Sequence, residues 1–120
     1  MKNNVIREKS MLFAIRIVNL YKFLCKTKKE FVMAKQILRA GTSIGANLAE
    51  AGCSISKKEF LAKTYIAFKE CAETKYWLEL LHKTEYISRE EYDSIASDCN
   101  EIYRILSAIT KTIREKGMGN

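Results

Sequence analysis

The fold follows from residues 88–116, which read "SREEYDSIASDCNEIYRILSAITKTIREK". Apolar side chains recur in this stretch at alternating spacings of three and four: Tyr92, Ile95, Cys99, Ile102, Leu106, Ile109 and Ile113. Side chains at such spacings share one face of a helix, so the pattern predicts a single amphipathic helix. Ser88, followed three residues later by Glu91, predicts a capping box at its start. Ile87 and Tyr92 then occupy the two positions of a hydrophobic staple.

Start signals of the same kind recur upstream of this helix. Ser56 with Glu59 and Thr27 with Glu30 each have the capping-box spacing. A second staple is predicted from Ile55 and Phe60. Helices are therefore expected at about 4–26, 29–52, 57–83 and 89–116. Because the connections are only a few residues long, we predict an all-α fold, an antiparallel up-and-down four-helix bundle in a single domain over residues 1–120.

The composition is that of an ordinary globular protein, with 48% hydrophobic and 29% charged residues. No window approaches the roughly 18 apolar residues that cross a bilayer, and no signal peptide is apparent. We therefore expect a cytoplasmic protein without a membrane partner. The four cysteines form no C-x-x-C pair, and His82 is the single histidine, so zinc is not expected. Buried structural thiols are favoured over a disulfide or a redox role.

The positive charge is concentrated at the start of the chain. Residues 1–40 hold ten Lys and Arg against two Glu, while residues 41–80 are balanced and residues 81–120 are slightly acidic. This asymmetry suggests a polyanionic partner or an acidic surface on another copy, although a merely solvated helix face stays open. Without a recognition-helix or aromatic RNA motif, we expect phosphate contacts without base readout. The candidate nucleic-acid-binding residues are Arg16, Lys22, Lys26, Lys28, Lys29, Lys35 and Arg39.

Two glycines interrupt the second predicted helix, in "RAGTSIGANLAEA" at residues 39–51. A phosphate-binding loop would need a preceding strand and a Gly-Lys-Ser/Thr end, and a membrane contact would need an uninterrupted apolar segment. Neither is present. Each interior glycine costs a helix about 1 kcal/mol relative to alanine, so a bulky neighbour must offset this loss by packing closely. The small residues of the predicted contact stripe are Ala34, Gly41, Gly45 and Gly52.

Residues 36–81 also carry a resemblance, in "QILRAGTSIGANLAEAGCSISKKEFLAKTYIAFKECAETKYWLELL". This segment resembles the signature of the bacterial four-helix-bundle family of proteins encoded by intervening sequences in large-subunit ribosomal RNA genes. The matching skeleton includes Arg39-Ala40, Ser43-Ile44, Asn47, Ala49-Glu50, Ser56, Glu59-Phe60, Ile66-Ala67, Glu73 and Leu78 to Leu81. One departure is Glu50-Ala51-Gly52, where the family commonly has Ala-Glu-Gly.

The resemblance implies a homopentamer of four-helix bundles without known enzymatic activity. Accessory proteins of diversity-generating retroelements share that fold, form basic pentamers, and contact a reverse transcriptase and nucleic acid. The choice between the ribosomal RNA branch and the retroelement branch stays open. The resemblance assigns family-motif and helix-packing roles to Arg39, Gly41, Ser43, Gly45, Asn47, Glu50, Gly52 and Glu73.

Polar residues of this motif favour a structural role over catalysis. Asn47 and Glu50 share one helical face. A catalytic site would use them with Glu73 as an acid/base pair, but no residue nearby supplies a nucleophile together with its general base. A polar network that fixes helix register or a subunit contact is favoured instead. His82 is expected at the rim, and Trp77 in the core rather than stacked on a base.

The sequence therefore supports two functions. The first is a non-enzymatic, ring-forming bundle whose basic face holds structured RNA or a nucleic-acid-bearing partner such as a reverse transcriptase. The second is a purely structural homo-oligomer that uses no nucleic acid. Its basic first helices would meet acidic residues on the fourth helices of neighbouring subunits, at Glu90, Glu91, Asp93, Asp98 and Glu101. We expect no catalytic residue, cofactor, metal or small-molecule substrate.

Overall fold

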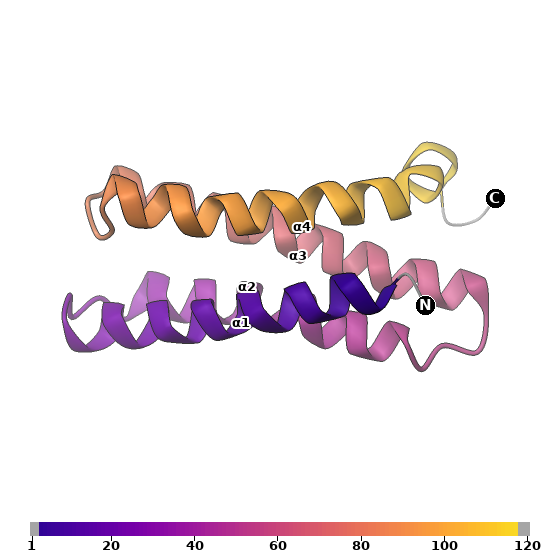
Figure 1. The fold of residues 1–120 in the computed structure, drawn as a ribbon, viewed down its shortest axis with the longest axis horizontal. Helices are drawn as coiled ribbons and strands as arrows, with labels where there is room; N and C mark the ends of the chain where they lie inside the picture. The colour runs from indigo at the N-terminus through magenta and orange to yellow at the C-terminus, as the bar shows by residue number, and fades with distance from the viewer. Residues whose placement is uncertain (1–2, 118–120) are drawn as a thin grey trace.

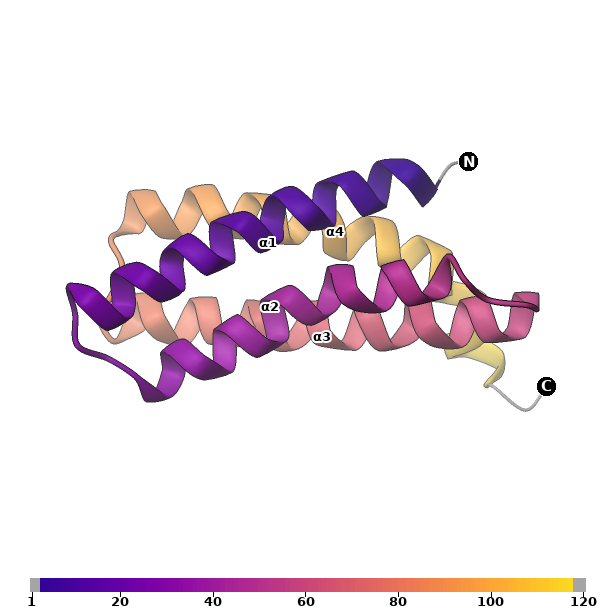
Figure 2. The same ribbon diagram turned by 90° about the horizontal axis from the view of Figure 1, so that it is seen from below.

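Four helices make up the fold in the computed structural model, which describes residues 3–117 (Figure 1). They are α1 (Asn3–Lys26), α2 (Val32–Ala51), α3 (Lys57–Lys83) and α4 (Arg89–Lys116), and no strand occurs within residues 3–117. Each helix packs against the next, and a smaller contact between α1 and α4 closes the bundle (Figure 2). The bundle extends over 46 × 24 × 22 Å. The prediction of an all-α four-helix bundle is confirmed.

The start of α4 has the predicted capping box. The Ser88 hydroxyl accepts from the Glu91 backbone N–H at 3.1 Å, and the Glu91 carboxylate accepts from the Ser88 N–H at 2.9 Å. At the start of α3, Ser56 likewise accepts from the Glu59 N–H at 3.0 Å. There the carboxylate reaches one residue further back, to the Ile55 N–H at 2.8 Å. The predicted Ile55 staple is wrong, because this side chain is 95% exposed.

The start of α2 differs from the prediction. The expected Thr27 capping box is wrong because the Thr27 N–H donates to the Phe23 carbonyl at 2.9 Å and so ends α1. Lys29 then has a φ of 55°, a left-handed conformation that interrupts the helical path. As a result α2 begins at Val32 rather than near residue 29. Glu30 still caps it, since its carboxylate accepts from the Ala34 N–H at 3.0 Å.

The close contact at the glycines is made by α1 of the same chain. A Cβ built on Gly41 would lie 2.7 Å from Ile17 Cγ1, a distance that real Cβ atoms essentially never show. A Cβ on Gly45 would lie 3.3 Å from the Ser10 hydroxyl, and one on Gly52 would lie 3.1 Å from the Arg7 guanidinium. Gly41 and Gly45 of α2, and Gly52 directly after its end, therefore all lie close against α1.

The core runs the length of the bundle and receives side chains from all four helices. Within it, Cys71 of α3 and Cys99 of α4 are fully buried, with their sulfur atoms 3.8 Å apart. All four cysteines are free thiols, but the prediction of buried thiols is wrong for Cys53, which is exposed, while Cys25 is half-buried. The hydrogen bond with Cys71, together with burial, raises the pKa of the Cys99 thiol above its ordinary value. Within residues 3–117, no helix is both long enough and apolar enough to span a lipid bilayer.

Candidate nucleic-acid interface

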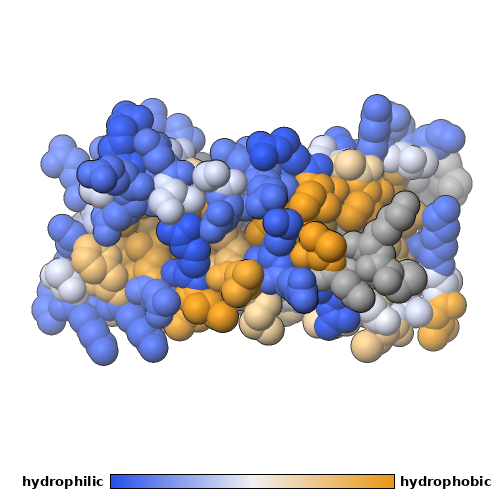
Figure 3. All heavy atoms as spheres, viewed as in Figure 1, coloured by the Kyte–Doolittle hydropathy of each residue, from blue (hydrophilic) through white to orange (hydrophobic). Residues whose placement is uncertain are grey.

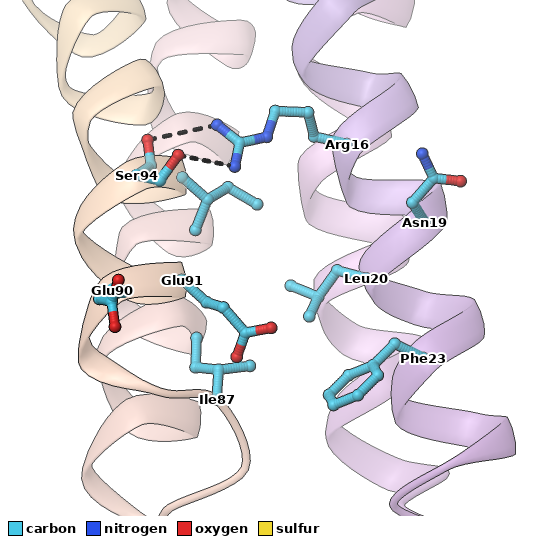
Figure 4. Close-up of a pocket in the computed structure, with 9 residues that line it drawn as sticks. Arg16, Asn19, Leu20, Phe23, Ile87, Glu90, Glu91 and Ser94 are labelled. Carbon is cyan, nitrogen blue, oxygen red and sulfur yellow. Dashed lines mark hydrogen bonds between the residues drawn. The ribbon is translucent and has the colours of Figure 1, made fainter.

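The seven basic candidates fall into two groups, because two arginines are engaged within the bundle. Arg16 was named as a nucleic-acid-binding candidate, but its guanidinium turns toward α4 (Figure 4). It donates to the Asp98 carboxylate at 2.8 Å and to the hydroxyl and carbonyl oxygens of Ser94 at 3.0 and 3.3 Å. Arg16 therefore joins α1 to α4 and has few donors left for a ligand.

Arg39 is held in a similar way between α2 and α3. Its guanidinium lies 3.2 Å from the Glu73 carboxylate and 3.4 Å from the Gln36 side-chain oxygen. The same Glu73 oxygen accepts from the Trp77 indole N–H at 2.9 Å. Trp77 itself packs against the core, as expected for an aromatic residue in an apolar stripe.

The other five candidates are lysines at one end of the bundle, and we call them the lysine patch. They are Lys22, Lys26, Lys28, Lys29 and Lys35. All five are exposed, and none forms an ion pair with a residue described by the structure. Two lie on the last turns of α1, two in the connection, and one near the start of α2. The Lys28 ammonium lies 5.8 Å from the centre of the Phe23 ring.

Acidic residues of α4 pair with basic residues of α1 inside one chain. The Lys9 ammonium lies 3.0 Å from the Glu101 carboxylate, and Arg16 contacts Asp98. Asp98 and Glu101, two of the acidic residues predicted to meet neighbouring subunits, are thus paired with α1 of their own chain. Glu90 and Asp93 are exposed on the first turns of α4. The start of α4 lies at the same end of the bundle as the α1–α2 connection (Figure 1).

Comparison with known proteins identifies the family. Residues 2–108 match the family model described as 23S rRNA-intervening sequence protein. The chain belongs to this family. A crystal structure of a protein with unknown function from the S23 ribosomal protein family of Bacteroides thetaiotaomicron is also similar, with 58% sequence identity and a TM-score of 0.87. The similarity covers 88% of this chain and 98% of that chain, whereas no curated protein matches.

The polar residues of the family motif form separate contacts rather than one network. Asn47 donates to the Ser43 carbonyl of its own helix at 2.9 Å, and the Ser43 hydroxyl donates to the Arg39 carbonyl at 2.6 Å. Glu50 lies 2.7 Å from the Lys63 ammonium, and this hydrogen bond raises the lysine pKa. Glu50 and Glu73 therefore join α2 to α3 at two places, each facing a cation. This arrangement suits helix register rather than acid/base catalysis.

His82, the single histidine, packs against an aromatic ring of α4. The His82 ring stacks on Tyr92 with ring centres 4.7 Å apart, at the contact between α3 and α4. Among residues 3–117 there is no cluster of three or more His, Cys, Asp or Glu placed to hold a metal ion.

Two surface grooves were missed by the sequence analysis. One, of about 500 Å³, lies between α1 and α4 and is shown in Figure 4. The other, of about 940 Å³, is mainly apolar and lies at the opposite end of the bundle, where Phe60 and Ile109 line it. Both grooves are formed by helices far apart in the sequence, so no local pattern could indicate them.

Proposed function

We propose that this protein is a non-enzymatic, oligomeric helical bundle that binds structured RNA through the lysine patch. The observation that carries the proposal is the set of five exposed lysines between residues 22 and 35, none of which pairs with an acidic residue of the described range 3–117. Their ammonium groups are free to replace counterions at phosphates. The family description, which refers to intervening sequences of 23S rRNA, suggests ribosomal RNA as the first ligand to test.

The lysine patch fits phosphate contacts rather than base recognition. Lysine ammonium groups are flexible point charges, which suit phosphate oxygens but do not discriminate base edges as a bidentate arginine does. Each phosphate contacted in a duplex contributes about −0.9 to the slope of log affinity against log salt. Assembly into a homopentamer would repeat the patch and raise the affinity through multivalent contacts.

A salt titration with two matched variants tests this function. Binding of a labelled double-stranded 23S rRNA fragment is measured by fluorescence anisotropy at several KCl concentrations. Lys28→Glu/Lys29→Glu changes the patch, and Lys57→Glu/Lys58→Glu makes the same charge change on exposed lysines at the start of α3. We expect the first variant to bind at least about tenfold more weakly with a shallower slope, because each lost contact removes about 0.9 of slope. Equal weakening by both variants would refute a localised patch.

A second candidate function is a structural or protein-binding role without direct RNA contact. This role includes service as an accessory factor to a reverse transcriptase. The observation that favours it is the exposure of Met11, Leu12 and Ile15 on α1, since apolar side chains contribute little to phosphate binding. In the same titration, an oligomer that retains no RNA even at low salt would support this function and reject the first.

A further inference from the structure

A pocket of about 430 Å³ lies at the end of the bundle that carries the lysine patch, and we call it the end pocket. It lies where the end of α1 and the α1–α2 connection meet the α3–α4 connection, and Lys28 of the patch lines it. It adjoins the groove of Figure 4, with which it shares Phe23, Ile87 and Glu91. Its volume is within the range of about 300–1,000 Å³ that small-molecule sites span. The end pocket is therefore large enough for one small organic group.

Both signs of charge line the end pocket. Lys28 and Arg89 supply exposed cations. Glu85 and Glu91 supply exposed carboxylates. One oxygen of Glu91 accepts from the Ser88 N–H at 2.9 Å, and a carboxylate has further lone-pair positions with which to accept from a ligand. A purely anionic ligand would be repelled by the carboxylates, and a purely cationic one by the two cations. The pocket therefore suits a ligand with an anionic group at one end and hydrogen-bond donors at the other.

Another part of the wall is apolar and aromatic. Phe23 of α1 and Tyr86 of the α3–α4 connection are half-buried there, and Ile87 is 5% exposed. Figure 4 shows Phe23 pointing from α1 toward α4 and Glu91 pointing back toward α1, so the ring and the carboxylate face the same space. In Figure 3 hydrophobic side chains lie between hydrophilic ones near this end of the bundle. Aromatic rings beside hydrogen-bond acceptors suit an unstacked nucleobase, because its face stacks and its edge donates hydrogen bonds.

We infer that the end pocket accepts one unpaired nucleotide of the RNA that binds the lysine patch. Lys28 and Arg89 hold its phosphates. Its base lies against Phe23 and Tyr86, and an amino group of the base donates to Glu91. Adenine, cytosine and guanine carry such an amino group, whereas uracil presents carbonyl oxygens, which a carboxylate repels. This inference rests on the proposed function and narrows its ligand to structured RNA with a bulged or looped-out base.

The end pocket adds base recognition to the phosphate contacts of the lysine patch. Phosphate contacts position an RNA but carry no sequence information. In a paired A-form duplex the bases are stacked, and the deep, narrow major groove keeps side chains from their edges. A bulged nucleotide can leave the stack and enter a pocket. Discrimination between RNAs therefore comes from the unpaired nucleotide, while the phosphates supply the salt-dependent affinity.

A series of RNAs that differ at one position tests the pocket. The duplex of the salt titration is compared, at one KCl concentration, with the same duplex carrying a single bulged A, C, G or U. A bulged abasic nucleotide is the matched control, because it keeps the phosphate and the flexibility of the bulge but has no base. We expect a bulged A, C or G to bind about tenfold more tightly than the abasic bulge, since stacking of one base alone contributes about fivefold or more. Uracil should lie in between. Equal affinity for the abasic and the base-bearing bulges overturns the inference.

Glu91→Gln tests the hydrogen bond to the base. Glutamine keeps an acceptor for the Ser88 N–H, as in capping boxes that use Gln, so α4 stays capped. Its amide also presents donors, so the preference for A, C and G over U should fall to within about twofold. Glu59→Gln makes the same change at the start of α3, at the opposite end of the bundle, and should keep the wild-type preference (Figure 1). An unchanged preference in Glu91→Gln contradicts the proposed contact.

Phe23→Leu tests the aromatic wall. Leucine keeps an apolar side chain and removes the ring, so the advantage of every base over the abasic bulge should fall to within about threefold. The result is a ratio of two affinities of the same variant, so a change in the folded fraction cancels. A ratio that stays at the wild-type value shows that the ring does not contact the base and rejects the assignment.

The fully paired duplex separates failure of this inference from failure of the proposed function. A protein that retains no RNA of the series even at low salt loses both. Salt-dependent binding of the paired duplex that Lys28→Glu/Lys29→Glu weakens, without a gain from any bulged base, keeps the proposed function and overturns this inference alone.

Discussion

Ile17 of α1 lies so close to Gly41 of α2 that a methyl group on Gly41 would come within 2.7 Å of Ile17 Cγ1 and 2.9 Å of Cγ2. Ile17 is fully buried, so its side chain has little room to turn away. The two helices are therefore fitted to each other at this point by the absence of a side chain. Stability should depend on the pair rather than on either residue alone.

Gly41→Ala should destabilise the protein by roughly 1 kcal/mol. Overpacking a buried contact costs about 1–3 kcal/mol, and alanine recovers about 1 kcal/mol of helix propensity. Urea unfolding followed by circular dichroism measures the difference. In an Ile17→Ala background the contact is gone, so Gly41→Ala should become neutral or stabilising. Gly45→Ala is the matched control, because its nearest neighbour, Ser10 Oγ, would lie 3.3 Å away. An equal loss in both backgrounds would contradict the proposed contact.

Ser88→Ala should lower the free energy of unfolding by about 1 kcal/mol, because it removes the hydroxyl that caps α4. Thr27→Ala serves as the control. Thr27 has the same sequence pattern but caps no helix, so its substitution should change stability by less than about 0.5 kcal/mol. Both values come from urea midpoints at constant m-value. A larger loss at Thr27 than at Ser88 would show that the start of α2 is assigned incorrectly.

Stability should fall as pH rises above the ordinary range of a thiol pKa. The folded state raises the pKa of Cys99 above its usual value of 9.0, through the hydrogen bond with Cys71 and burial. Above that value the unfolded chain loses this proton while the folded chain keeps it, so unfolding is favoured. The slope approaches about 1.4 kcal/mol per pH unit for one thiol. No loss from this group is expected below the unfolded pKa.

The measurement is a series of urea midpoints between pH 7 and pH 10. Cys99→Ala should flatten the alkaline part of this series, whereas Cys53→Ala, at an exposed thiol, should leave it unchanged. An alkaline decline of the same steepness in both variants would assign the effect to other groups.

Glu73→Ala should destabilise the protein by about 1–2 kcal/mol, because it leaves the Trp77 indole N–H without its acceptor and Arg39 without its ion pair. Glu73→Gln keeps an acceptor oxygen and should lose less. Trp77 is the only tryptophan, so its fluorescence emission reports directly on this contact. Identical emission maxima in wild type and Glu73→Ala would contradict a hydrogen bond at the indole.

Local sequence patterns predicted a helix start correctly where the capping residue and the residue that it caps lie within one helical turn. Ser56 and Ser88 cap α3 and α4 as their spacing to a glutamate indicates. Thr27 has the same spacing, but its N–H already belongs to the last turn of α1. The pattern alone cannot show that a backbone group is in use, so the sequence placed the start of α2 too early.

The candidate interface was predicted less completely than the fold, because its arginines have distant partners. The periodicity of α1 and α2 indicates which basic residues lie away from the core, and the five lysines are exposed. Arg16 meets Asp98 across 82 positions and Arg39 meets Glu73 across 34. Nothing in the neighbourhood of either arginine signals such a pairing. The groove between α1 and α4 is hidden for the same reason, since its walls come from the first and the last helix.

The even number of helices brings the chain back to the end from which it started. Asn3 and Lys116 lie at the same end of the bundle, and the α1–α2 connection that carries Lys28 and Lys29 lies at the other (Figure 1). A fluorophore or surface tether attached at either terminus therefore leaves the lysine-bearing end unobstructed.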